Sequence, residues 1–259
     1  MNRINKVFKQ GSVFIAYITA GQRGLDYSFK VALSLIDAGV DLLEIGVPFS
    51  DPVADGPVIQ KAMIDALNNN IAILDVLELI KKIRRQSDVP IGLFSYYNPI
   101  LQVQFKHNFF KLAKNAGVDG ILVVDLPLEE SGHLVKSCED FNIDPIFVVT
   151  PSTDLARLKK INKKAKGFLY YACRKGTTGM KNSLPDNFVS KIQLIKQNSK
   201  LPVVAGFGVS SREVAKEILC YADGFVVGSL FVDAIEKCAN PEAVKQLVMK
   251  IDPRREVIT

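Results

Sequence analysis

Short apolar runs rich in β-branched and aromatic residues alternate with longer amphipathic stretches along almost the whole chain. Runs of the first kind are typical of buried strands, and stretches of the second kind are typical of surface helices. Their regular alternation predicts parallel strands joined by crossover helices. We expect eight strands, at residues 13–19, 41–46, 91–95, 120–124, 144–149, 167–172, 203–206 and 224–227.

Eight parallel strands are the number that closes a (β/α)8 TIM barrel, and a length of 259 residues suits a fold of this kind. Helical patterns lie between the strands, for example at residues 28–38, 74–85, 109–116, 129–141 and 212–219. No stretch has the composition of a linker. We therefore predict a single α/β barrel domain over residues 1–259, with additional short helices.

The cysteines and the apolar runs limit the class of protein. The four cysteines show no C-x-x-C spacing and no nearby pair of histidines, so neither a zinc site nor a disulfide framework is expected. The apolar stretch after the basic N-terminus lacks a signal-peptide cleavage pattern, and no run approaches the length that spans a bilayer. A cytoplasmic protein that does not enter membranes is the expectation.

The formal net charge of +6 favours anionic partners. The basic residues, however, are spread over predicted helices, as in KKIRR at 81–85 and KKINKK at 159–164. Such runs are typical of solvated helix faces. We do not expect a nucleic-acid partner.

Polar residues and glycines cluster immediately after the predicted strands. In a (β/α)8 barrel all such positions face the C-terminal mouth, where active sites are found. Residues far apart in the sequence should therefore converge on one pocket. The segments concerned contain Glu44 and Asp55, residues 96–99, Asp125, and residues 174–179, 206–208 and 228–229.

Glu44 lies in the apolar run DLLEIGVP at residues 41–48. Burying an ionisable carboxyl group costs several kcal/mol unless its surroundings are built for it. Burial also raises the pKa of a carboxyl group toward neutrality, which lets it serve as an acid or a base. Glu44 is therefore the first candidate for proton transfer.

Asp55 admits two interpretations. It is either a turn or helix-capping residue, a common role for Asp, or a second carboxylate that stays anionic and accepts a hydrogen bond from a substrate N–H. Asp125 fits a rim or capping position better than a catalytic one. His107 and His133 lie in predicted helical segments, away from the strand ends, and neither is expected to be a catalytic base.

Two glycine-rich segments, GFGVSS at 206–211 and VGS at 227–229, follow the last two predicted strands and precede helices. Backbone N–H groups there can bind a phosphate, although glycine also simply permits tight turns. A dinucleotide fingerprint is not expected, because the acidic residue about 20 positions on is missing. The loop CRKGTTGM at 173–180 can close over a bound anion or remain a solvated loop. Lys175 in this polar loop is a poor candidate for a Schiff base.

The run LEIGVPFSDPVADGPVIQ at residues 43–60 closely resembles the signature of the tryptophan synthase α family. The similarity extends over most of the chain, through FIAYITAG at 14–21, YYNPI at 96–100, DLPLEE at 125–130, PIF at 145–147, GFGVS at 206–210 and GS at 228–229.

The resemblance implies a barrel that cleaves indole-3-glycerol phosphate into indole and glyceraldehyde 3-phosphate by a retro-aldol reaction, with no metal or other cofactor. By resemblance, Glu44 is the general acid and base, and Asp55 accepts a hydrogen bond from the indole N–H. Thr178 positions the catalytic carboxylate, and Tyr170 matches an active-site tyrosine or is a plain strand aromatic.

The resemblance also implies which residues contact the phosphate and the indole ring of the substrate, and which protein is the partner. Phosphate contacts are expected from Gly179, Gly208, Gly228 and Ser229. The indole pocket is expected to be lined by Tyr17, Phe94, Tyr96, Leu122 and Phe207. The partner is a β subunit that carries pyridoxal phosphate, in an α2β2 heterotetramer serving tryptophan biosynthesis, with segments around residues 51–52 and 98–99 near the interface.

Two alternatives to a lyase in an α/β complex stay open at this point. One is a stand-alone lyase that releases indole, which would not respond to an added β subunit. The other is a non-catalytic barrel that activates or scaffolds the β subunit. Glu44, Asp55 and the phosphate-site glycines favour the lyase.

Overall fold

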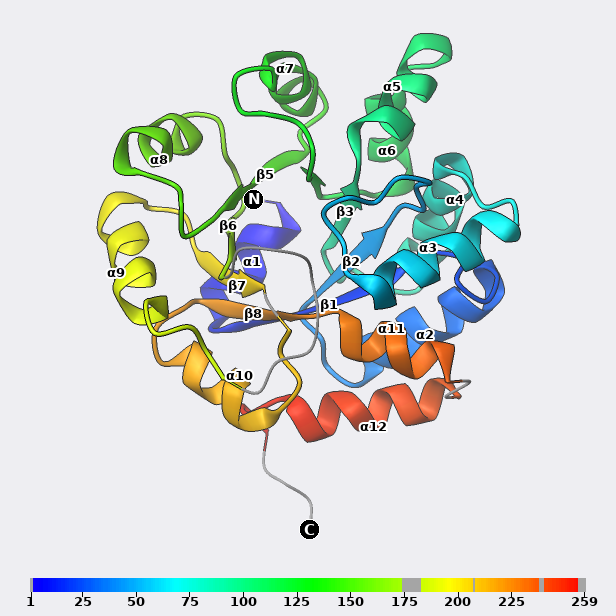
Figure 1. The fold of residues 1–259 in the computed structure, drawn as a ribbon. Coiled ribbons are helices and arrows are strands. Elements are labelled where there is room, and N and C mark those ends of the chain that lie inside the picture. Colours follow the sequence, from blue (N-terminus) through cyan, green and yellow to red (C-terminus); the bar gives the residue numbers. More distant parts are fainter. Residues whose placement is uncertain (1, 174–182, 207, 238–239, 256–259) are drawn as a thin grey trace.

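The computed structural model describes residues 2–173, 183–206, 208–237 and 240–255. Parallel strands close into a barrel in the order β1 to β8, and each strand pairs with its sequence neighbours (Figure 1). The predicted (β/α)8 fold is therefore confirmed. The strands are β1 Val13–Thr19, β2 Leu42–Gly46, β3 Ile91–Ser95, β4 Gly120–Val123, β5 Asp144–Val149, β6 Leu169–Ala172, β7 Val203–Gly206 and β8 Gly224–Val227.

The described helices surround the barrel, except α1, whose Ile4 packs into the barrel's inner core (Figure 1). No described helix has the length and apolar character needed to cross a membrane. The helices are α1 Arg3–Gln10, α2 Leu25–Asp37, α3 Pro57–Asn68, α4 Ile73–Arg84, α5 Tyr97–Lys106, α6 Phe109–Ala116, α7 Gly132–Asp140, α8 Leu155–Asn162, α9 Phe188–Asn198, α10 Arg212–Leu219, α11 Ser229–Glu236 and α12 Pro241–Ile251.

Five of the eight predicted strands have the observed bounds, and the differences at the others have local causes. The strand predicted at 167–172 begins only at Leu169, because Gly167 has a φ of +72°, outside the range of extended backbone. The helix predicted at 129–141 is shorter, at Gly132–Asp140, because the three preceding residues form turns.

Side chains along each strand point alternately into the barrel and toward the helices. In β2, Leu42 packs in the inner core, whereas Leu43 and Ile45 pack in the outer core against the helices. Glu44 therefore shares the inward face with Leu42. All five residues of β2 are buried, and the carboxyl group of Glu44 therefore lies inside the barrel.

Asp119, just before β4, joins separate elements at the N-terminal end of the barrel. Its carboxylate is 5% exposed and accepts hydrogen bonds from Arg84 Nη2 at 2.8 Å, from the Ile91 backbone N–H at 2.9 Å and from Arg3 Nη1 at 3.2 Å. Removing one partner of a buried ion pair leaves the other partner's charge uncompensated.

We expect Asp119→Ala to lower the free energy of unfolding by about 3–5 kcal/mol, because Arg84 loses its carboxylate partner. Urea unfolding measures the change. Asp88→Ala is the matched control, since the Asp88 side chain is 90% exposed and its ion pair with Arg3 should be worth less than about 1 kcal/mol. Equal losses in the two variants would contradict the role given to Asp119.

Candidate active site

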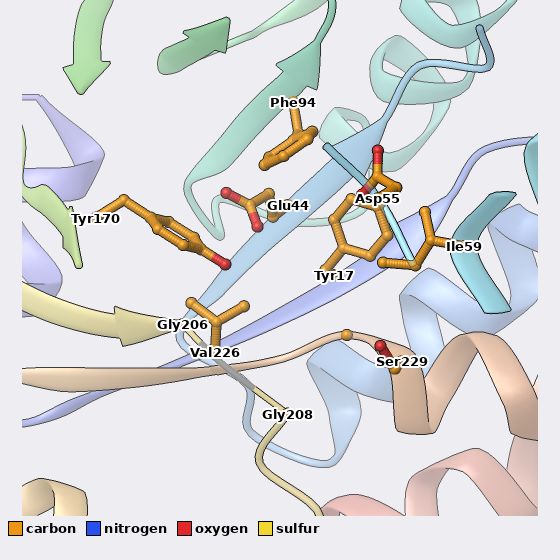
Figure 2. Close-up of a pocket in the computed structure, with 11 residues that line it drawn as sticks. Tyr17, Glu44, Asp55, Ile59, Phe94, Tyr170, Gly206, Gly208, Val226 and Ser229 are labelled. Atoms are coloured by element: carbon orange, nitrogen blue, oxygen red, sulfur yellow. The ribbon is translucent and has the colours of Figure 1, made fainter. Parts of the chain in front are cut away.

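A cavity opens among residues at the C-terminal ends of the strands (Figure 2). Its wall combines two carboxyl groups, aromatic rings and glycine backbone. Predicted residues from six of the eight βα units meet there, those of β1, β2, β3, β6, β7 and β8, as expected of a barrel mouth. The predicted residues that line it are Tyr17, Glu44, Asp55, Phe94, Tyr170, Gly208, Gly228 and Ser229.

Glu44 presents its carboxyl group to this cavity from β2 (Figure 2). The side chain is 2% exposed, and Oε2 has no hydrogen-bond partner within the described chain. Burial, with the negative charge of nearby Asp55, raises the pKa of Glu44 from 4.5 to about 8. At neutral pH Glu44 is therefore mostly protonated and can act as a general acid.

Asp55 lies in the turn before α3, opposite Glu44 in the cavity wall (Figure 2). It is not the helix cap, because Gly56 occupies that position. Its carboxylate is 2% exposed and accepts a hydrogen bond from the Tyr96 hydroxyl at 2.8 Å. Burial raises the pKa of Asp55 to about 6, and the Tyr96 hydrogen bond opposes that rise. Asp55 therefore remains largely ionised at neutral pH, where Glu44 is not.

The raised pKa of Glu44 predicts a dependence of stability on pH. Between pH 4.5 and about 8 the folded chain keeps a proton that the unfolded chain has released, so rising pH destabilises the fold by up to about 1.4 kcal/mol per unit. Glu44→Gln cannot ionise. Its stability advantage over the natural chain should grow across this range and then level off.

Urea unfolding at a series of pH values measures this difference. Glu129→Gln is the matched control, because the Glu129 side chain is 58% exposed and lies outside the cavity. A stability difference between Glu44→Gln and the natural chain that stays constant with pH would show that the Glu44 pKa is not raised.

Aromatic rings form the apolar part of the cavity wall. Tyr17 and Phe94 meet edge to face with their ring centroids 5.5 Å apart, and Tyr170 lies across the cavity from them (Figure 2). Two glycines leave space for the phenol rings. A Cβ atom added to Gly46 would lie 2.2 Å from the Tyr17 hydroxyl, and one added to Gly206 would lie 2.2 Å from the Tyr170 hydroxyl, so larger residues would clash there. The wall can hold a flat aromatic ligand.

Backbone at the ends of β7 and β8 forms another side of the cavity. Gly208 has a φ of +55°, a conformation that favours glycine. Helix α11 begins at Ser229 with Gly228 as its cap and no side-chain capping bond, whereas α10 is capped by the Ser211 hydroxyl. The first N–H groups of α11 are therefore the ones available to a bound anion.

Some predicted positions lie elsewhere. Tyr96 and Leu122 are buried in the same inner core but do not line the cavity. Thr178, Gly179 and Phe207, like Lys175, lie outside the described residues. Conversely, Ile59, Gly206 and Val226 line the cavity although the sequence did not predict them there. Gly206 lies in the glycine-rich segment 206–211 and Ile59 in the run 43–60, but neither Ile59 nor Val226 carries a signal that separates it from ordinary core residues.

The remaining polar candidates do not join the site. Asp125 is exposed and accepts a hydrogen bond from the Tyr97 backbone N–H at 2.8 Å, which caps the start of α5. His107 and His133 are exposed on or beside helices. Within the described ranges no group of three or more His, Cys, Asp or Glu residues could hold a metal ion.

Similarity to known proteins identifies the family of this chain. The family model described as "Tryptophan synthase alpha chain" matches residues 4–256. A tryptophan synthase alpha chain of Coxiella burnetii is 49% identical over 253 residues, covering 98% of each chain, and one of Chlamydia felis is 47% identical over 261 residues, covering 98% of this chain and 100% of the relative.

A solved structure of the tryptophan synthase a2b2 complex from Pyrococcus furiosus contains a similar chain. It is 35% identical, with a TM-score of 0.85, covering 93% of this chain and 97% of that one. Sequence and fold agree, and this chain belongs to the tryptophan synthase alpha chain family.

Proposed function

We propose that this chain cleaves indole-3-glycerol phosphate into indole and glyceraldehyde 3-phosphate, as the alpha subunit of tryptophan synthase. The observation that carries the proposal is the pair of buried carboxyl groups facing one cavity, with pKa values of about 8 for Glu44 and about 6 for Asp55. Two carboxyl groups whose pKa values differ in this way can divide the roles of acid and anion.

The substrate has a flat apolar end and an anionic end, and the cavity offers surfaces for both. The indole ring would lie between Tyr17, Phe94 and Tyr170. The phosphate would bind backbone N–H groups near Gly208 and at the start of α11. Binding both ends holds the bond to be broken beside Glu44 and Asp55.

Cleavage begins with a proton. Protonated Glu44 gives its proton to the indole C3 atom, which still carries the glycerol chain, and the ring becomes a cationic indolenine. The resulting Glu44 carboxylate takes the proton of the adjacent glycerol hydroxyl. The O–H electrons form the aldehyde C=O, the carbon–carbon bond breaks, and its electron pair returns to the ring. The products are indole and glyceraldehyde 3-phosphate, with no water consumed.

Asp55 supports the intermediate in this scheme. Its carboxylate accepts a hydrogen bond from the indole N–H, and the negative charge stabilises the positive charge that develops on the ring. Because the site is buried, this interaction is stronger than it would be in water. Thr178, Gly179 and Phe207 keep the roles implied by the family resemblance, as proposals outside the described residues.

We propose a β subunit as the protein partner, in an α2β2 complex. Two of the most exposed large apolar side chains are Val53 at 77%, which directly follows the segment 51–52, and Phe105 at 84%, which lies on α5, the helix that contains residues 98–99. Exposed apolar residues of this kind are typical of protein contacts. We also propose that residues 1–259 form one domain and that the protein acts in the cytoplasm in tryptophan biosynthesis.

The scaffold alternative is not favoured, because it gives no use to two buried carboxyl groups facing a cavity. The test is to incubate the purified protein with indole-3-glycerol phosphate, alone and with a β subunit, and to measure indole and triose phosphate. We expect both products in equal amounts, with faster turnover when the β subunit is present.

Each other outcome identifies one of the alternatives. Product formation that does not respond to the β subunit would identify a stand-alone lyase. No product under either condition, together with binding to the β subunit, would identify a scaffold and overturn the proposed activity.

A further inference from the structure

We propose that Tyr96 is a positioning residue, whose hydroxyl fixes the Asp55 carboxylate in the orientation that the reaction needs. This inference rests on the function proposed above and deepens it. From the sequence, Tyr96 was expected in the wall of the indole pocket. The side chain is instead 1% exposed and absent from the cavity lining, so a direct contact with the ligand does not explain it.

The Tyr96 hydroxyl makes two hydrogen bonds to neighbouring residues of the turn before α3. It donates to Asp55 Oδ2 at 2.8 Å and accepts from the Ala54 backbone N–H at 3.0 Å. A phenol hydroxyl has one proton to donate, and Asp55 receives it. The Tyr96 hydroxyl thus links the Asp55 carboxylate to the backbone of the same turn and restricts the side-chain torsions of Asp55. The other carboxylate oxygen, Oδ1, remains available to a ligand.

The Tyr96 side chain is itself held firmly. It follows β3 directly and is the N-terminal cap residue of α5. Its ring stacks on Phe49 with the centroids 4.8 Å apart and the planes inclined by 25°. A hydroxyl on a ring packed in this way cannot easily follow a carboxylate that moves, so it acts as a fixed point for Asp55.

The turn that carries Asp55 is secured from its other side by Gln60. The Gln60 amide Nε2 donates to the Asp55 backbone carbonyl at 2.8 Å. The turn also closes on itself through the Asp55 N–H to the Pro52 carbonyl at 3.0 Å. Gln60 therefore fixes the backbone of Asp55, and Tyr96 fixes its side chain.

The surroundings of Asp55 make the donated hydrogen bond important for its charge. The negative charge of Asp55 raises the pKa of four titratable groups around it, namely Glu44 from β2, Tyr17 from β1, Tyr170 from β6 and Tyr96 itself. Among the described side chains, only Tyr96 donates a hydrogen bond to Asp55. That bond lowers the pKa of Asp55 against the opposing effect of burial.

Tyr96→Phe removes the hydroxyl and keeps the ring. We expect kcat to fall about 10- to 100-fold, the range for loss of a hydrogen bond to a charged group, with little change in KM. The acidic limb of the kcat profile should move to higher pH. The matched control is Tyr171→Phe, which removes a buried hydroxyl that has no partner in the described chain and faces the helices, and which should leave kcat unchanged.

A direct titration tests the same idea without turnover. The carboxyl carbons of aspartate are labelled with ¹³C, and the Asp55 signal is assigned by its absence in Asp55→Asn. In Tyr96→Phe the Asp55 pKa should rise above its natural value of about 6. Replacing Tyr96 by 3-fluorotyrosine, which keeps the packing and makes the hydroxyl a stronger donor, should lower it.

Unchanged Asp55 titration in both Tyr96 variants would overturn the proposal, and so would a Tyr96→Phe variant with full kcat. Should Tyr96→Phe fail to fold, as shown by thermal melting, the 3-fluorotyrosine protein decides alone. If the natural chain does not cleave indole-3-glycerol phosphate, the proposed function fails, while the titration still decides whether Tyr96 controls Asp55.

Discussion

Glu44→Gln should lower kcat for indole release by about 10³-fold, within the range for loss of a general acid and base. Gln has nearly the shape of the protonated Glu44 side chain, which faces the cavity from β2, but it cannot give a proton to the indole C3 atom. Nor can it take the proton of the glycerol hydroxyl. Steady-state kinetics with indole-3-glycerol phosphate measure the effect.

Substrate binding should survive the Glu44→Gln substitution, because the proposed phosphate site is formed by backbone N–H groups near Gly208 and at the start of α11, and not by the Glu44 side chain. Glycerol 3-phosphate affinity therefore serves as the check on the site's integrity. Glu129→Gln, on the exposed surface, should retain full activity. Turnover close to that of the natural chain in Glu44→Gln would rule out Glu44 as the proton donor.

Asp55→Asn should lower kcat by about 10²- to 10³-fold, as removal of a charge-stabilising group at an active site commonly does. Asn can still accept the Tyr96 hydrogen bond, so the turn before α3 should keep its shape. Asp55→Asn removes the negative charge that stabilises the cationic indolenine in the proposed mechanism. Its removal should also lower the Glu44 pKa, because the Asp55 charge contributes to raising it.

Kinetics as a function of pH measure both consequences of Asp55→Asn. The limb assigned to Glu44 should move to lower pH while kcat falls. Asp125→Asn is the matched control at the same rim, because Asp125 is exposed and an Asn oxygen can still cap α5. An Asp55→Asn variant with unchanged kcat would limit Asp55 to a structural role.

The fold was predictable because the strands of a parallel barrel are buried on both faces. The apolar runs at 91–95, 144–149 and 203–206 are short and bounded, and the observed strands coincide with them. The strand near 167 was extended too far, because the left-handed conformation of Gly167 does not show in an apolar pattern. Conformations of single glycines depend on tertiary packing.

A candidate site residue could be predicted where its side chain differs in chemistry from the residues around it in the sequence. Glu44 is a carboxyl group in an apolar strand, and its side chain points into the barrel because it lies two residues after Leu42 in β2. Ile59 and Val226 gave no such signal, because an apolar wall residue and a core residue look alike in sequence. The bond between Tyr96 and Asp55 joins residues 41 positions apart, and only the folded chain brings them together.

The proposed mechanism requires that Glu44 meet the substrate as a protonated acid. Infrared difference spectra between the natural chain and Glu44→Gln, recorded as a function of pH, isolate the Glu44 carboxyl band. We predict a protonated carboxyl at pH 7 that ionises with a pKa near 8. A Glu44 that is already a carboxylate at pH 7, with a pKa near its ordinary value of 4.5, would contradict the proposed proton transfer.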